Sequence, residues 1–506
     1  MINKLDNIKL SLGDGEELLV RAAEKELGKK PAYFRILKKS LDARKGREIK
    51  WVYSVEFAAE RLPAPAPLSR IKTDKRIIVV GSGPAGLFCA VRLADYGFKP
   101  IVIERGQDVD ARAEAVAKFA DGGALDEQSN VQFGEGGAGT FSDGKLNTQT
   151  HSGYTREVLG TFARFGAPAE IEYLSKPHIG SDNLKTVVKN MRGYIISSGG
   201  EVRFGTRLVG LKTANGTIRS AICESGGGTY AESCDGLVLA VGHSARDTFE
   251  MLADESFAME RREFAVGVRI EHLQEEINAA QYGGAAAMLP PADYKLVSHA
   301  SKRSCFTFCM CPGGYVMPAA SERGGIVTNG MSNYSRDGAN ANSALLVQIR
   351  QADFGGDGIL AGMDFQRAIE RKAYAFSGSY AAPVQLAGDF MKGRVSTDFG
   401  GVKPTYPKTV FADMREVLPD YVCGALKAAL PDMAKRLKGF DSGESLLTAP
   451  ETRFSSPVRI LRGANLESFT TANVYPCGEG SGYSGGITSS AADGLRIADC
   501  IYTKYK

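Results

Sequence analysis

A glycine-rich turn between a strand pattern and a helix pattern constrains the fold of this chain more than any other feature. The apolar run KRIIVV is followed at once by Gly81-Ser82-Gly83-Pro84-Ala85-Gly86 and then by the helical stretch LFCAVRLADYG. The first glycine permits a tight turn, the second lets the backbone approach a pyrophosphate, and the third lets the helix pack on the strand. The start of the helix supplies free N–H groups and a positive dipole. The junction therefore predicts a dinucleotide site in a βαβ unit.

An acidic residue stands where a ribose-binding carboxylate is expected. A second strand pattern, KPIVIE, ends at Glu104, 23 positions after Gly81, close to the spacing of the acid that binds the ribose hydroxyls. A carboxylate there disfavours a 2′-phosphorylated nucleotide by charge repulsion. We therefore expect the adenosine ribose at Glu104.

Two downstream segments extend this unit. The first segment contains the strand pattern GGEVRFGTRLVGL, a β-meander pattern (TIRSAICES, GTYAESC) and the strand pattern LVLAVGHS, in that order. The second segment, at the far end of the chain, predicts a strand, a glycine-rich turn and a helix in NVYPCGEGSGYSGGITSSAADGLRIADCI. Together they resemble the two-dinucleotide-binding-domain flavoproteins, whose FAD domain is closed by a C-terminal strand ending in Gly-Asp. The pair here is Gly478-Glu479, and the resemblance places Leu208 near the adenine and Glu479 at the ribityl or pyrophosphate region.

The helix after this turn is expected to face the flavin. Gly485, Gly486 and Ile487 begin it, so its backbone N–H groups and dipole would stabilise an anionic reduced flavin at the N1 and O2 edge. The alternative is a glycine-rich hairpin that only packs on the sheet.

The loop GEGGAGT offers further N–H groups to a diphosphate or an isoalloxazine ring, and Arg112 is a candidate partner of the diphosphate. Relatives of the glutathione-reductase type carry a cysteine pair after this loop, whereas this chain reads TFSDGK. A disulfide reductase of that pattern is therefore excluded. Lys145 remains a candidate neighbour of flavin N5 or an exposed loop lysine. The complete set of expected FAD contacts is Gly81, Ser82, Gly83, Pro84, Ala85, Gly86, Glu104, Arg105, Arg112, Gly137, Ala138, Leu208, Gly242, Gly478, Glu479, Gly485, Gly486 and Ile487.

Longer strings carry a closer resemblance. The chain resembles the uncharacterised FAD-dependent dehydrogenase family of bacteria in six strings: NVQFGEGGAGTFSDGKL, KPHIGSDNL, VGVRIEH, FCMCPGGYVMPAASE, ETRFSSPVRI and YPCGEGSGYSGGITSSAADGL. The resemblance spans nearly the whole chain and implies a single Rossmann FAD domain. No second GxGxxG follows a strand pattern in residues 250–450, so electrons would come from the substrate itself or from NADH or NADPH held transiently.

We expect an α/β fold in three parts. Residues 1–70 predict a small α+β unit with the order strand, helix, strand, strand, for which a ferredoxin-like fold is the expectation, and the proline-rich stretch RLPAPAPLSR ends it near 62–74. Residues 75–250 and 451–506 would form the Rossmann-type FAD-binding domain with its parallel sheet and β-meander. Residues 251–450 would form an inserted α+β cap over the flavin.

Candidate catalytic residues besides Lys145 come from this cap and the segment before it. His178 in KPHIGSDNL is a candidate imidazole for catalysis or ligand binding. Strand alternation in VGVRIEH places Arg269 on a face opposite Val268 and Ile270, lining a cavity or paired with Glu271 on a solvated face. Arg336 is the preferred clamp for a carboxylate or phosphate, with salt bridging as its alternative.

Cys309 and Cys311 in FCMCPGG would point the same way on a strand. They are either redox-active or buried core thiols, and a close backbone approach at the following glycines explains the motif equally well.

Composition limits the remaining classes. With a net charge of +4, a start without an apolar leader and no apolar stretch of membrane-spanning length, we expect a cytoplasmic protein without a membrane span. Nine scattered cysteines and five histidines show no zinc spacing, so we expect no metal.

The leading hypothesis is an FAD-dependent oxidoreductase that moves a hydride between flavin N5 and an unidentified small substrate, anionic if the arginines bind it. The alternatives are a non-catalytic flavin sensor and an RNA-modifying flavoprotein that binds nucleic acid through its N-terminal unit, which the modest net charge disfavours. The basic residues of that unit are Lys29, Lys30, Arg35, Lys38, Lys39, Arg44, Lys45 and Arg47.

Overall fold

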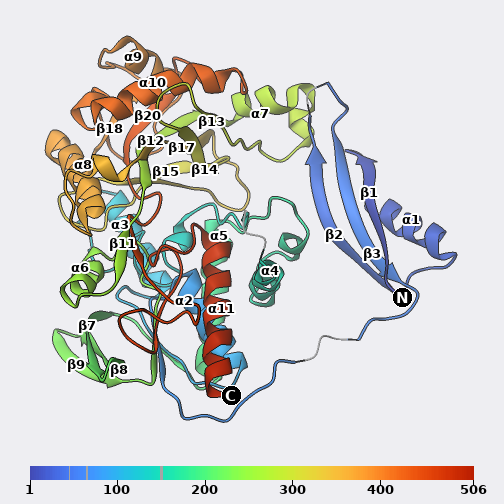
Figure 1. Ribbon diagram of the computed structural model, residues 1–506. Helices are drawn as coiled ribbons and strands as arrows, with labels where there is room; N and C mark the ends of the chain where they lie inside the picture. The colour runs from blue at the N-terminus through green and yellow to red at the C-terminus, as the bar shows by residue number, and fades with distance from the viewer. Residues whose placement is uncertain (45, 64–66, 149–151) are drawn as a thin grey trace.

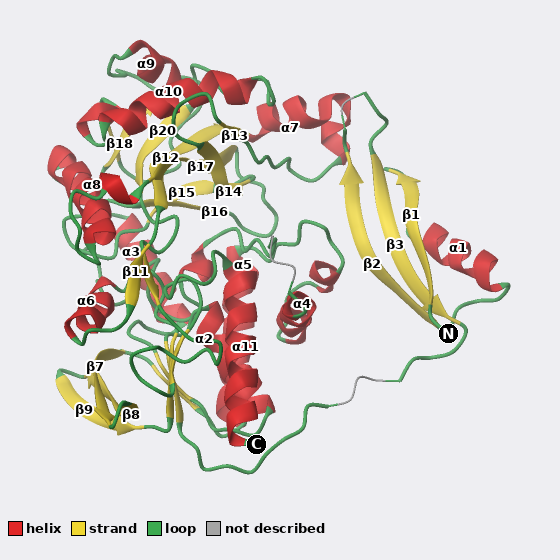
Figure 2. Cartoon of the chain, in the orientation of Figure 1, coloured by secondary structure: helices red, strands yellow, loops and turns green. Residues whose placement is uncertain are grey.

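The computed structural model describes residues 1–44, 46–63, 67–148 and 152–506 and sorts their strands into separate sheets (Figure 1). Residues 64–66 of the proline-rich linker and Lys45 lie outside the described residues. Figure 2 shows the N-terminal sheet set to one side of two larger units, which lie one above the other. The strands change sheet near residues 250 and 450. Among the described residues, no helix combines the length and apolar character needed to cross a bilayer.

The N-terminal unit is an antiparallel sheet of order β1-β3-β2 with one helix against it. Its elements are β1 (Asn3–Ser11), α1 (Glu17–Leu27), β2 (Tyr33–Asp42) and β3 (Lys50–Ala58), in the expected order. A ferredoxin-like fold would add a second helix and a fourth strand. The described residues of this unit contain neither, because the chain passes into the proline-rich linker after β3, so that expectation is wrong in this respect.

The outer edge of β2 is paired with the main body. The N–H of Lys39 donates to the Tyr173 carbonyl at 2.8 Å, and the N–H of Ser175 donates to the Lys39 carbonyl at 2.9 Å. An edge strand left open would expose unpaired backbone groups, so this contact both protects the edge and ties the unit to residues 173–175.

A parallel sheet of order β22-β10-β4-β5-β6 forms the centre of the second unit. Its strands are β4 (Ile77–Val80), β5 (Ile101–Ile103), β6 (Glu201–Arg203), β10 (Gly236–Leu239) and β22 (Val474–Pro476). Side chains of β4 alternate between two cores. Ile77 and Val79 pack with the helices, whereas Ile78 and Val80 pack with the meander. A parallel sheet covered on both faces requires such a continuous apolar run, which confirms the expected Rossmann-type α/β arrangement.

Helices cover one face of this sheet, and the meander together with α6 covers the other. The helices of the unit are α2 (Pro84–Asp95), α3 (Val109–Ala120), α4 (Tyr154–Arg164), α5 (Ser181–Ser197), α6 (Arg246–Asp254) and the C-terminal α11 (Ile487–Tyr505), with short 3₁₀ turns η1 (Ala138–Phe141) and η2 (Ala169–Glu172). The meander is β7 (Thr206–Ala214), β8 (Thr217–Ser225) and β9 (Gly228–Ser233). Helices α2 and α11 share a core with β4 although about 400 residues separate them in sequence, so the two ends of the split domain fold together.

The third unit is a seven-stranded sheet of order β13-β14-β17-β12-β20-β18-β19. Its strands are β12 (Phe264–Leu273), β13 (Val297–Ser298), β14 (Cys305–Cys311), β17 (Asn340–Ile349), β18 (Ala382–Leu386), β19 (Thr409–Phe411) and β20 (Leu446–Glu451). Its helices are α7 (Gln274–Tyr282), α8 (Ala361–Ser377), α9 (Ala387–Lys392) and α10 (Asp420–Ala434), with 3₁₀ turns η3 (Gly283–Met288), η4 (Gln351–Asp353) and η5 (Met414–Glu416). Two ribbons, β15 (Tyr315–Pro318) with β16 (Thr328–Met331) and β11 (Met259–Arg261) with β21 (Val458–Ile460), complete the strands.

Candidate active site

A cavity of about 1020 Å³ is lined by residues of both large units. Its lining runs from the β4–α2 turn, past the start of α11, to β14 and the end of β20. Ligand sites commonly measure ~300–1000 Å³, so this space can hold a dinucleotide as well as part of a second small molecule.

The β4–α2 turn forms one end of the cavity. A Cβ on Gly86 would lie 1.9 Å from the Gly81 carbonyl oxygen, and Gly81 itself has a φ of +99°, so both positions require glycine. A Cβ on Gly83 meets no atom closer than 3.7 Å. No side chain caps the N-terminus of α2. Its first N–H groups are thus available to a phosphate.

Glu104 lines the cavity, but its carboxylate also has internal partners. One oxygen accepts from the N–H and the hydroxyl of Ser82 at 2.9 and 2.8 Å. The other accepts from the N–H groups of Gly106 and Gly134, both at 3.0 Å. A carboxylate offers about four lone-pair positions, so a ribose hydroxyl has to share them with these donors.

Several residues expected at FAD lie outside the lining formed by the described residues. Ser82, Gly86 and Gly478 support the turns behind it, while Arg112 departs furthest from its expected role. Its fully buried guanidinium donates to the carbonyls of Asn130, Val131, Gly134, Glu135 and Gly137. Since carbonyls already occupy its donors, Arg112 holds the glycine loop in shape and is not a diphosphate ligand. The expected residues that do line the cavity are Gly81, Gly83, Pro84, Ala85, Glu104, Arg105, Gly137, Ala138, Leu208, Gly242, Glu479, Gly485, Gly486 and Ile487.

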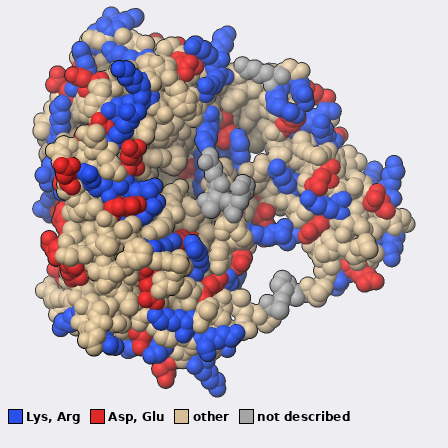
Figure 3. Space-filling model, in the orientation of Figure 1, with Lys and Arg blue, Asp and Glu red and all other residues tan. Residues whose placement is uncertain are grey.

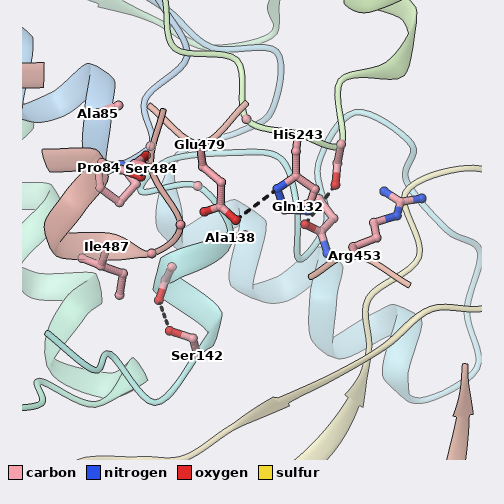
Figure 4. A pocket seen from close by; sticks show the side chains of 18 of the residues that line it. Pro84, Ala85, Gln132, Ala138, Ser142, His243, Arg453, Glu479, Ser484 and Ile487 are labelled. Atoms are coloured by element: carbon pink, nitrogen blue, oxygen red, sulfur yellow. Dashed lines mark hydrogen bonds and ion pairs between the residues drawn. The ribbon is translucent and has the colours of Figure 1, made fainter. Parts of the chain in front are cut away.

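The N-terminus of α11 lies beside the start of α2 in the cavity wall, and Figure 4 shows Ile487 and Ser484 near Pro84. Gly486 precedes the helix with a φ of +136°, and a Cβ on Gly485 or Gly486 would meet no atom within 4 Å. No side chain caps this helix. An anionic ring edge can therefore approach the N–H groups directly.

Glu479 and His243 point toward each other in this wall, with His243 Nδ1 3.5 Å from Glu479 Oε1 (Figure 4). Burial raises the pKa of Glu479 to about 7 and lowers the pKa of His243 to about 4. His243 Nε2 is buried and has no hydrogen-bond partner in the described structure. The imidazole is therefore neutral at pH 7 and offers one ring nitrogen to a ligand.

Lys145 lines the cavity, whereas Arg336 and His178 lie behind it. Arg336 Nε donates to Asp143 at 2.9 Å, and Lys145 Nζ lies 3.4 Å from the same buried carboxylate. His178 Nε2 lies 3.1 Å from the Tyr334 carbonyl oxygen, and its ring stacks on Tyr334. The expected roles of Arg336 as an anion clamp and of His178 in catalysis are therefore not supported, because both side chains are used internally.

Arg269 also differs from the expectation. Strand β12 pairs on both sides and is buried along nearly its whole length, so it has no solvated face. The guanidinium is fully buried and lies 3.3 Å from Glu451 and 3.0 Å from the Cys309 carbonyl oxygen. Arg269 therefore lies behind the cavity wall and contacts Glu451 and Cys309, and these two residues line the cavity.

The wall contributed by the cap is aromatic. Phe454 makes edge-to-face contacts with Phe306 and Phe308, at centroid separations of 5.3 and 4.5 Å. Lys295 and Arg453 add positive charge to the lining, and Figure 4 shows Arg453 on the side of the pocket away from Pro84. This wall suits an apolar or aromatic molecule that carries a negative group.

The sequence interpretation missed His243, Glu451 and Phe454 as cavity residues. His243 directly follows Gly242, which was expected at FAD, so its place after a parallel strand was an available signal. Glu451 and Phe454 lie where the chain leaves the cap and re-enters the FAD-binding unit. Their place in the cavity depends on the direction of β20, which the sequence does not indicate.

Comparisons with known proteins agree with this geometry. Residues 263–454 match the family model described as FAD-dependent protein, C-terminal domain-like, residues 79–129 match an NAD(P)-binding Rossmann-like domain, and residues 1–58 match a domain of unknown function. An uncharacterised protein of Clostridium beijerinckii is 46% identical over 535 aligned positions, which cover 100% of this chain and 99% of that protein. The chain belongs to this family of FAD-dependent proteins. FAD is its cofactor.

Solved structures are similar to this chain at much lower sequence identity. A flavin-dependent brominase has a TM-score of 0.39 at 11% identity, with 85% of this chain and 80% of that chain covered. The glycerol-3-phosphate dehydrogenase of Bacillus halodurans, complexed with FAD, has a TM-score of 0.38 at 10% identity, with 85% and 65% covered. A geranylgeranyl bacteriochlorophyll reductase-like protein of Thermoplasma acidophilum has a TM-score of 0.37 at 11% identity, with 85% and 78% covered.

Three basic residues of the N-terminal unit are paired with acidic side chains. Lys39 lies 2.7 Å from Glu16, Arg35 lies 3.3 Å from Glu172, and Arg44 pairs with Asp42. Acidic and basic side chains alternate over this unit in Figure 3. Nucleic-acid binding needs phosphate-facing charge that internal pairing removes, so this arrangement does not favour an RNA-modifying role.

The raised pKa of Glu479 predicts that FAD affinity depends on pH. Below pH 7 the carboxyl is neutral, and above pH 7 its negative charge would oppose a pyrophosphate bound nearby, so the Kd for FAD should rise by up to about tenfold from pH 6 to pH 8. Quenching of free-FAD fluorescence by apoprotein measures this. The change should disappear in Glu479→Gln and persist in Glu451→Gln, and a pH-independent Kd in the unmodified protein would contradict it.

Proposed function

We propose that the protein transfers a hydride between N5 of FAD and a carbon of a small substrate bound against the cap. The observation that carries the proposal is one continuous cavity lined by both uncapped helix ends and by the aromatic wall of the cap. The flavin would supply the two-electron redox chemistry. The chain's residues would bind and orient the flavin and the substrate and would exclude water from the cavity.

The residues that line the cavity fit FAD. Gly83 and the start of α2 would hold the pyrophosphate, and Glu104 the adenosine ribose, while Gly485 and Gly486 leave room for the ring edge at the start of α11. Lys145 reaches the cavity from the loop after η1, and we place it beside the flavin. His243, neutral at pH 7, would donate or accept a hydrogen bond near Glu479.

The substrate class follows from the wall of the cap. Aromatic rings at Phe306, Phe308 and Phe454 suit an apolar body, and Lys295 suits a carboxylate or phosphate. Arg453 would orient such a group only partly, because Glu370 already pairs with it. We therefore propose a small anionic substrate with an apolar portion, handled in the cytoplasm, since nine free cysteines do not make a structural disulfide framework.

Anaerobic reduction of the bound flavin tests the proposal. NADH, NADPH and a panel of carboxylate and phosphate metabolites are added singly, and the visible flavin absorbance is followed. At least one donor should bleach it on the timescale of turnover. Bleaching by dithionite alone would contradict the proposal and favour a flavin-binding sensor.

A further inference from the structure

Two cysteines beside the cavity have no role in the proposed hydride transfer. Cys309 and Cys311 lie at the end of β14, where the pairing with β17 shifts register between Phe308 and Cys311. Cys309 takes a φ of +42° at this bulge, which breaks the strand alternation expected from the sequence. Cys309 consequently lines the cavity, whereas Cys311 is completely buried behind it.

Cys311 is in direct contact with the backbone of Cys309 and with the guanidinium of Arg269. The Cys311 thiol donates to the Cys309 carbonyl at 3.3 Å. Nη2 of Arg269 lies 3.0 Å from that carbonyl oxygen and 3.7 Å from Cys311 Sγ. Residues two apart span at most about 7 Å even when extended, and the left-handed turn at Cys309 shortens that span. Cα atoms this close are within reach of a disulfide.

Their surroundings separate the two thiols chemically. Interaction with the Cys311 side chain, aided by the charges of Arg269 and Lys145, lowers the pKa of Cys309 to about 6, while the same interaction and burial raise the pKa of Cys311. Cys305, on the same strand, shows the ordinary behaviour of a core thiol, since burial raises its pKa to about 12. Reactive cysteines are those with lowered pKa and access to a ligand, and Cys309 has both.

We propose that Cys309 and Cys311 are a redox-active dithiol that exchanges two electrons with the flavin in this cavity. The Cys309 thiolate and the Cys311 thiol together lose two electrons and one proton as their S–S bond forms. Oxidised FAD takes up those electrons and that proton and becomes the anionic dihydroflavin, so charge and atoms balance. The reverse direction stores an electron pair in the protein after the flavin is reduced. The proposal rests on FAD binding and not on the identity of the small substrate.

A reductive titration of the holoprotein tests this directly. Dithionite is added anaerobically to protein first oxidised by air, and both flavin absorbance and free thiols are followed. The unmodified protein should consume four electrons per chain and gain two thiols, because flavin and disulfide are each two-electron couples. Cys309→Ser and Cys311→Ser should each consume two electrons and keep the bound FAD. Cys305→Ser is the matched control and should consume four.

A second measurement does not depend on the flavin titration. Alkylation of Cys309, followed by peptide mass spectrometry, should accelerate with pH around a midpoint near 6 in the reduced protein. In oxidised protein the peptide that contains both residues should be lighter by two hydrogens and resist alkylation. Two-electron uptake by the unmodified protein, with both thiols alkylated after oxidation, would overturn the proposal while leaving FAD binding and hydride transfer intact.

Discussion

Gly83→Val is expected to give a folded protein that purifies without FAD. The position faces open cavity, since a Cβ there meets nothing nearer than the Gly137 Cα at 3.7 Å. The valine branches would occupy the space where the pyrophosphate must approach the start of α2. We expect the FAD content to fall at least tenfold, equivalent to ~1.4 kcal/mol or more of binding free energy. Absorbance of the purified protein and of FAD-reconstituted apoprotein measures it.

Matched glycine substitutions separate this effect from misfolding. Gly193 lies exposed on α5, and a Cβ added there would meet no atom within 4 Å, so Gly193→Val should keep full FAD content. Gly86→Ala should behave differently from both, because its Cβ would strike the Gly81 carbonyl at 1.9 Å and destabilise the domain itself. Stoichiometric FAD in Gly83→Val would show that the pyrophosphate lies elsewhere.

The dinucleotide end of the site was predictable because its signals are local. A turn that needs glycine, a strand that needs two apolar faces and an acid at fixed spacing are all set within about 30 residues. Gly81, Gly83 and Glu104 all line the cavity. The uncapped start of α11 was found in the same way, from one glycine-rich turn before a helical pattern.

The roles of charged residues in and beside the cap could not be predicted because they depend on distant partners. Arg269 and Arg112 look like ligand-binding groups in sequence, yet each is buried against groups from other segments, the latter mostly backbone carbonyls. Strand alternation also failed at Cys309, since a bulge with positive φ leaves little trace in a sequence without glycine at that position. The periodicity of apolar residues predicts which face of a strand or helix is apolar, but it does not predict which partner each polar side chain contacts.

Glu370→Ala is expected to have the largest effect on stability among the cavity's supporting residues. This fully buried carboxylate accepts from Arg246 at 2.9 Å and from Arg453 at 3.0 and 3.1 Å, and it joins α8 to α6 and to the segment after β20. Removing it leaves two buried guanidinium groups without their shared counter-charge. Loss of one partner from a buried ion pair costs about 3–5 kcal/mol, which a lowered denaturant midpoint and Tm should report.

Glu250→Ala is the surface control for that substitution. Glu250 pairs with Arg367 at 2.9 Å but is about half exposed, 48% for its side chain, so its loss should cost less than about 1 kcal/mol. Equal losses in the two variants would contradict the predicted role of Glu370.

The pH dependence of stability has a definite sign. Although burial alone would raise it, the charges of Arg246 and Arg453 hold the pKa of Glu370 below its usual range. The carboxylate therefore stabilises the fold above the pKa of an unfolded glutamate, about 4.3, and that stabilisation is lost as the pH falls below it. The unmodified protein should lose stability on acidification more steeply than Glu370→Gln, which carries no titrating group at this position. Because Arg453 also lines the cavity, the same variant should weaken FAD or substrate binding at neutral pH, which links the packing of the cap to the chemistry of the site.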